Sequence, residues 1–152
     1  MSVRKYPTFD GQKAYDPPFY KVVFFSGSPL GVPFLKALSQ DPRFEVVGVV
    51  SMPPKPVGRG QKVSPNVVAS FAQELGIDNI KTPSKLTPKT SEGEEFIKWL
   101  KELSPDFLVV VAYGKIIPQA VLDIARIAPV NVHGSILPAY RGASPLQEVF
   151  LD

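Results

Sequence analysis

The stretch DFLVVVAY, residues 106–113, predicts the strongest strand of the chain. No polar residue interrupts it between Phe107 and Ala112, which is typical of a strand buried on both faces of a sheet. Shorter apolar and β-branched runs predict further strands at residues 21–25, 44–50, near 79–81 and at 129–134.

Segments with helical spacing of apolar residues alternate with these strands. Helices are expected at residues 30–40, 64–76, 92–103, 118–126 and 144–151. In the second of these, Ser64 is expected to cap the helix, Pro65 to occupy its first position and Gly76 to end it. The alternation predicts an α/β fold, a Rossmann-like open, mostly parallel sheet with helices on both faces.

Composition narrows the class of protein. With 152 residues the chain can bury one core. It has no cysteine and one histidine, which excludes disulfides, thiolate metal sites and a cysteine nucleophile, and we expect no metal. No apolar stretch approaches the roughly 20 residues needed to cross a bilayer, so no membrane association is expected. The net charge of +3 is too small to indicate nucleic-acid binding by itself.

The first twenty residues differ from the rest. They are rich in tyrosine, proline and charge and lack hydrophobic periodicity, so an extension that packs weakly or is partly disordered is expected over residues 1–20. No apolar segment typical of a secretory signal is present, and a cytoplasmic location is expected. Residues 21–152 then form the folded part, and the last expected helix has barely begun at Asp152, which suggests a fragment.

Asn131 and His133 are the candidate functional pair. Ligands in open α/β sheets bind outside the carboxyl ends of the strands, where these residues are expected. Their spacing of two places both side chains on one face of a strand. A lone histidine is more often a partly buried structural residue. The neighbouring amide favours a catalytic pair instead.

A glycine-bearing turn, SGSPLG at residues 26–31, follows the first expected strand. It lacks the G-x-G-x-x-G spacing of dinucleotide sites and the G-x-x-x-x-G-K-[ST] phosphate loop. A tight strand-to-helix turn is therefore preferred to a nucleotide site.

The segment NVHGSILPAYRGASP, residues 131–145, resembles the motif of the 10-formyltetrahydrofolate-dependent formyltransferases. That motif is Asn-x-His-x-Ser-x-Leu-Pro followed by Arg-Gly-Ala-x-Pro. Two more stretches agree: VVVAYGKIIP (109–118) resembles the family's folate-pocket segment, and residues 44–65 resemble a segment with a tRNA-contacting basic loop. The resemblance runs from about residue 21 to the end and implies part of a formyltransferase catalytic domain.

The resemblance implies transfer of a formyl group from 10-formyltetrahydrofolate to the amino group of methionine on initiator methionyl-tRNA. Asn131 and His133 would polarise the formyl oxygen. His133 would also take part in proton transfer, since histidine changes protonation near neutral pH. The residues implied to contact folate are Tyr113, Gly114, Ile116, Ile117, Ser135, Ile136, Leu137 and Pro138. The two isoleucines would fit the core almost equally well, and Arg141 would either hold its loop or meet an anionic part of the substrate.

Residues 51–64 form an acid-free stretch with three cations, Lys55, Arg59 and Lys62. Its prolines and glycines predict an irregular loop rather than helix or strand. Three charges fit a solvated loop just as well as an RNA contact. The resemblance to the tRNA-contacting insertion favours binding of the phosphate backbone.

Two alternatives stay open. The acceptor could be a small amine, such as glycinamide ribonucleotide or an amino sugar, although a small substrate needs no basic loop. The chain could also be a non-catalytic folate-binding fragment, because the family's third catalytic residue, an aspartate, lies beyond the Arg-Gly-Ala-x-Pro loop and Asp152 does not match it. We expect the amino-terminal part of a longer, monomeric enzyme.

Overall fold

A five-stranded parallel sheet forms the centre of the molecule in a computed structural model that describes residues 17–57, 62–135, 137 and 138. Its strands lie in the order β5-β2-β1-β6-β7, and each neighbouring pair runs parallel. They span Tyr20–Phe25 (β1), Phe44–Val50 (β2), Ile80–Lys81 (β5), Phe107–Val111 (β6) and Ala128–Val132 (β7). The predicted open α/β sheet is confirmed.

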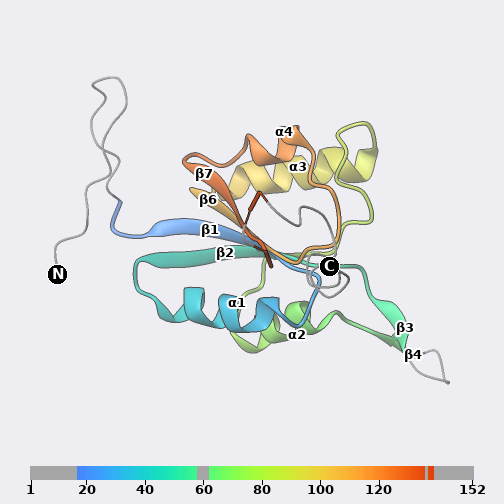
Figure 1. Cartoon of the computed structure of the whole chain (residues 1–152). Coiled ribbons are helices and arrows are strands. Elements are labelled where there is room, and N and C mark those ends of the chain that lie inside the picture. Colours follow the sequence, from blue (N-terminus) through green and yellow to red (C-terminus); the bar gives the residue numbers. More distant parts are fainter. Residues whose placement is uncertain (1–16, 58–61, 136, 139–152) are drawn as a thin grey trace.

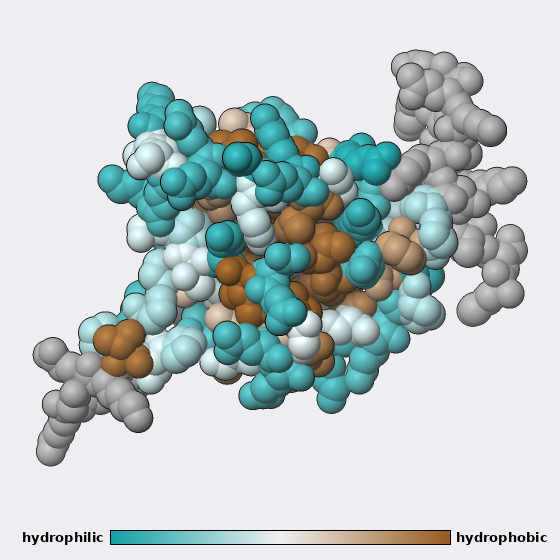
Figure 2. All heavy atoms as spheres, turned by 180° about the vertical axis from the view of Figure 1, so that it is seen from behind, coloured by the Kyte–Doolittle hydropathy of each residue, from teal (hydrophilic) through white to brown (hydrophobic). Residues whose placement is uncertain are grey.

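Helices cover both faces of this sheet (Figure 1). Helices α1 (Gly31–Gln40) and α2 (Val67–Glu74) lie on one face, and α3 (Ser91–Leu103) and α4 (Gln119–Leu122) lie on the other. Alternating strand residues feed two separate cores: Phe24 packs with the first helix pair, whereas Phe25 packs with the second. Seen from behind, apolar side chains show between hydrophilic side chains above and below them (Figure 2).

Several element boundaries differ from the prediction. Strand β7 ends at Val132, so His133 follows the strand instead of belonging to it, and β6 and α4 are also shorter than expected. The cap of α2 is Asn66, whose Oδ1 accepts a hydrogen bond from Val68 N at 2.9 Å, and not Ser64. Gly76 ends the helix as predicted, with a φ of +76°. The helix expected at residues 144–151 lies outside the described residues.

Two parts of the basic stretch form regular structure where a loop was expected. Lys55–Val57 (β3) and Lys62–Ser64 (β4) pair as an antiparallel hairpin that extends from the body of the molecule (Figure 1). Pro56 lies opposite Val63 in this two-stranded ribbon. A proline is tolerated there because an edge strand can turn the missing N–H away from its neighbour. The proline and glycine content of this stretch had predicted a loop, and that prediction was wrong for the paired residues.

Strand β1 begins at Tyr20, one residue inside the expected extension, and the Tyr20 side chain is buried. Among the residues that the structure describes, none belongs to a helix long and apolar enough to span a membrane.

Candidate active site

A crevice lies at the carboxyl ends of three neighbouring strands. The chain leaves β1 towards β2 and β5 and later returns to the other side of β1 as β6, so the topological switch point falls between β1 and β6. A hollow of about 430 Å³ opens there. Its walls come from the turns after β1 (Gly27, Ser28), β2 (Met52, Pro53) and β6 (Ala112, Tyr113, Gly114), and from the hairpin and start of α2 (Lys55, Ser64, Pro65, Asn66).

Close backbone contacts hold this crevice in shape. Gly27 N donates to Ala112 O at 3.1 Å, and Asn66 Nδ2 donates to Gly27 O at 2.9 Å. A Cβ at Gly27 would lie 2.6 Å from Tyr113 O and 2.5 Å from Met52 Cγ. Only glycine allows the two turns to approach so closely. The expected tight turn is present, closed by Gly31 N donating to Ser28 O at 2.9 Å.

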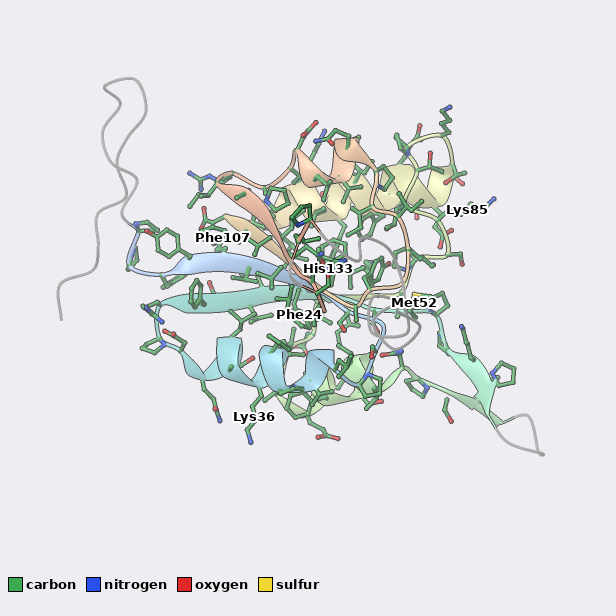
Figure 3. All side chains as sticks on the ribbon, viewed as in Figure 1. Phe24, Lys36, Met52, Lys85, Phe107 and His133 are labelled. Atoms are coloured by element: carbon green, nitrogen blue, oxygen red, sulfur yellow. The ribbon has the colours of Figure 1, made fainter. Side chains whose placement is uncertain are left out.

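His133 lies directly after β7, half-buried, at the same edge of the sheet (Figure 3). Its Nδ1 accepts a hydrogen bond from Ser135 N at 3.3 Å and lies 2.9 Å from Ser135 Oγ. A backbone N–H can only donate, so the bonded Nδ1 carries a lone pair. We infer that the neutral ring holds its proton on Nε2, which makes that nitrogen a hydrogen-bond donor.

Asn131 lies on β7 and is exposed. It pairs in register with Val110, whose side chain belongs to the core on the α3 and α4 face. Neighbours in a parallel sheet share a face, so the Asn131 amide projects to this same face. Asn131 and His133 are thus both placed at the carboxyl end of β7.

The residues expected to contact folate fall into two groups. Tyr113 is 2% exposed, and its ring packs edge-on against Phe25 with centroids 5.5 Å apart, so only its backbone faces the crevice. Burial raises the pKa of Tyr113 to about 12. Gly114, with a φ of +82°, lines the crevice. Ile116 is 93% exposed, whereas Ile117 packs partly buried against the core. Of the two isoleucines, only Ile116 is free of the core.

The loop after His133 is described in part. Ser135 is half-buried beside the imidazole, and Leu137 and Pro138, joined by a cis peptide bond, are exposed. Ile136 and Arg141 lie outside the described residues, so their expected contacts stay predictions.

Two of the three candidate RNA-binding residues belong to the hairpin. Lys55 is exposed on β3 and lines the crevice. Lys62 begins β4, with its backbone opposite Val57. Arg59 lies outside the described residues. The hairpin therefore carries a cation directly to the edge of the crevice.

The sequence did not predict the roles of three residues that hold the loops around the crevice. Asn66 joins α2 to the turn after β1, and Lys115 and Glu92 both contact the turn at residues 83–85. The Asn66 signal was available, since asparagine is a favoured helix cap. The other two contacts join distant segments, and no local pattern predicts them.

Residues 20–152 match the family model described as Formyl transferase. The chain belongs to the formyltransferase family. The methionyl-tRNA formyltransferase of Caldicellulosiruptor saccharolyticus is 41% identical over 131 residues, which cover 86% of this chain and 40% of that protein. The methionyl-tRNA formyltransferase of Acetivibrio thermocellus is 44% identical over 132 residues, covering 87% and 40%. The chain thus spans about two fifths of the length of these relatives.

Solved structures share the fold. Phosphoribosylglycinamide formyltransferase from Streptococcus pneumoniae TIGR4 superposes with a TM-score of 0.62 at 23% identity, covering 88% of this chain and 66% of that one. The enzyme of that name from Bacillus halodurans gives 0.65 at 22% identity, covering 86% and 64%. At these identities the likeness establishes the Rossmann-like formyltransferase fold.

Proposed function

We propose that this chain takes part in transfer of a formyl group from 10-formyltetrahydrofolate to the amino group of methionine on initiator tRNA. One observation carries the proposal. Asn131 and His133 lie at the carboxyl end of β7, the neighbour of β6, and the turn after β6 lines the switch-point crevice. The chain is 41–44% identical to proteins named methionyl-tRNA formyltransferase. Residues 21–152 would then form part of the catalytic domain, acting in the cytoplasm as a monomer.

The reaction is an acyl transfer. The amine nitrogen attacks the formyl carbon, and a new C–N bond forms as the carbonyl oxygen becomes an oxyanion. The bond to N10 of the folate then breaks, N10 takes up a proton, and the new amide nitrogen loses one. Hydrogen-bond donors aimed at the oxyanion lower the barrier. Asn131 Nδ2 and His133 Nε2 are the proposed donors.

The tautomer of His133 limits its role. Because Nδ1 accepts from Ser135 N, Nε2 holds the proton and donates. In this state Nε2 polarises the formyl oxygen and can give its proton to N10 of the leaving folate, which is the proposed part of His133 in proton transfer. The proton leaving the amine therefore goes to another group or to water.

The donor site is proposed to lie between the loop after β6 and the loop after His133. Backbone groups of Tyr113 and Gly114 would bind the folate, and the exposed Ile116 would contact its ring system. Ser135, Ile136, Leu137 and Pro138 would form the opposite wall. Proline limits the conformational freedom that this wall loses on binding.

The hairpin favours a nucleic-acid acceptor over a small amine. Lys55 stands at the rim of the crevice, on a ribbon that extends away from the body (Figure 1). A phosphate backbone entering the crevice would pass Lys55, Arg59 and Lys62. The likeness to phosphoribosylglycinamide formyltransferases is at 22–23% identity and bears on the fold alone.

A graft tests the proposal. Residues 20–152 replace the matching segment of the Caldicellulosiruptor saccharolyticus relative, and formyl transfer is measured with methionyl-tRNA and with glycinamide ribonucleotide. We expect formylation of methionyl-tRNA alone. Formylation of glycinamide ribonucleotide alone would favour the small-amine reaction. A folded graft that binds folate but transfers nothing would favour a binding module.

A further inference from the structure

The turn at residues 83–85, between β5 and α3, is held by two opposite charges. Lys115 Nζ donates to the carbonyl oxygens of Pro83 at 2.7 Å and Ser84 at 2.9 Å. The Glu92 carboxylate accepts from the backbone N–H groups of Ser84 at 2.7 Å and Lys85 at 3.2 Å. A cation thus binds the acceptors of this turn and an anion binds its donors. Hydrogen bonds to charged groups are the stronger kind.

The two charged residues that bind the turn come from separate parts of the chain. Glu92 lies in the first turn of α3, where a carboxylate is favoured by the helix dipole. Lys115 lies in the loop after β6, 31 residues beyond Ser84. The turn itself is anchored, since Pro83 is buried and Leu86 packs in the same core cluster as Tyr113. Lys115 therefore links the loop after β6 to the anchored turn at residues 83–85.

The loop at residues 114–117 has few other attachments. Within the described residues, its hydrogen bonds are those of the Lys115 ammonium group. Gly114 has a positive φ, and Ile116 is almost fully exposed. Ile117 contributes a partly buried contact with the core. Without the Lys115 bonds, this segment would be free to move relative to the crevice.

The charged groups around Lys115 affect its pKa. Partial burial lowers the pKa of Lys115, the Glu92 carboxylate raises it, and the Lys55 ammonium lowers it. Lys115 thus interacts with both the α3 anchor and the hairpin cation at the crevice rim.

We propose that Lys115 is a positioning residue for formyl-donor binding. Its ammonium group fixes the loop at residues 114–117 to the turn at residues 83–85, so that Gly114 presents its backbone groups in one arrangement. Lys115 acts through these loops and does not touch the reacting atoms. The inference rests on the proposed folate site and adds to it the device that holds one of its walls in place.

Donor affinity provides the test. The unmodified chain, Lys115→Met and Lys115→Arg are titrated calorimetrically with 5-formyltetrahydrofolate, a stable isomer of the donor. Methionine keeps the length of the side chain without its hydrogen bonds, and we expect its Kd to rise about tenfold. Arginine can still donate to two carbonyls, and we expect it to restore affinity to within about threefold. Lys85→Met is the matched control, because Lys85 lies in the same turn but extends into solvent (Figure 3).

Hydrogen exchange distinguishes a local effect of Lys115 on its loop from an effect on the stability of the whole fold. In Lys115→Met we expect faster exchange at residues 114–117 and unchanged protection of α3 and β1. Equal affinity of the unmodified chain and Lys115→Met would overturn this inference and leave the proposed function standing. Loss of protection throughout Lys115→Met would also overturn it, since Lys115 would then stabilise the whole fold. Absence of binding by the unmodified chain would overturn the folate site itself.

Discussion

At the scale of single residues, one hydrogen bond bears on the role proposed for His133. Ser135 N can only donate, so it selects the tautomer with a proton on Nε2. In this tautomer the ring would donate to an oxygen through Nε2 before any substrate arrives. Such preorganisation is the source of most oxyanion stabilisation in enzymes, because no dipole must reorient during the reaction.

Removing either proposed donor should slow the chemical step. In the active graft, His133→Ala or Asn131→Ala is expected to lower kcat by about 10² to 10³. The donor Kd should change little, because the interaction strengthens mainly in the transition state. Steady-state kinetics with methionyl-tRNA and calorimetric folate titration measure the two quantities.

Ser135→Ala is the matched control for His133. It removes the hydroxyl near Nδ1 but keeps the N–H that selects the tautomer, so a loss in kcat below about tenfold is expected. If His133→Ala kept its kcat and only lowered the Tm, His133 would be a structural residue.

Because Tyr113 is buried beside the crevice, the free energy of unfolding should depend on its ionisation at alkaline pH. Burial raises its pKa to about 12, above the ordinary value of 10.0. The folded state thus holds this proton more tightly than the unfolded chain, so its contribution is complete below pH 10 and is lost as the pH rises towards 12. In Tyr113→Phe this loss should be absent, so its advantage in free energy of unfolding over the unmodified chain should grow by about 1–2 kcal/mol between pH 7 and pH 11.5.

Urea unfolding at pH 7 and pH 11.5 measures the difference. At pH 7 Tyr113→Phe should be at least as stable as the unmodified chain, because the Tyr113 hydroxyl is buried without a hydrogen-bond partner among the described residues and its removal relieves a desolvation cost. Parallel decline of both chains at high pH would contradict the prediction.

At the scale of elements, the sequence predicted those strands and helix ends that depend on neighbouring residues alone. The uninterrupted apolar run before Ala112 becomes the interior strand β6, and Gly76 ends α2. The hairpin was missed because prolines and glycines suggest a loop, whereas pairing across residues 55–64 depends on register. The Lys115 contacts were missed because they join segments more than 30 residues apart.

The hairpin makes a prediction about RNA. Contact between Lys55 and a tRNA phosphate would release a counterion, so Lys55→Ala should weaken tRNA binding and reduce the slope of log K against log salt concentration by about 1. Titrating the chain with initiator tRNA at several KCl concentrations measures this slope. Lys36→Ala is the control, since Lys36 is exposed on α1, away from the hairpin (Figure 3). Identical slopes for all three chains would remove Lys55 from the RNA interface.

At the scale of the whole molecule, one edge of the sheet lacks cover among the described residues. Val130 is 44% and Val132 39% exposed on β7, in register with Val109 and Val111 of β6. These apolar side chains lie on the α1 and α2 face of the sheet, opposite to the face of Asn131. The relatives extend well beyond the matched segment, which amounts to about two fifths of their length.

We therefore expect the 152-residue chain to bind the donor without completing the reaction. The described walls of the crevice and the two proposed oxyanion donors lie within it, so 5-formyltetrahydrofolate should bind. His133 in its Nε2-protonated form cannot receive the proton from the attacking amine through that nitrogen. The family resemblance implies that an aspartate beyond Pro145 relays this proton. Loss of a positioned general base typically costs about 10² to 10⁴ in rate.

Comparing the chain with the graft isolates this contribution. Formation of formylmethionyl-tRNA is followed with radiolabelled methionyl-tRNA and 10-formyltetrahydrofolate, for the chain alone and for the graft at equal concentration. The chain should stay within about twofold of the buffer control, since its residual rate would fall below the sensitivity of the assay. Turnover by the chain at a rate near that of the graft would show that His133 and water alone move the proton, and would remove the need for a further residue.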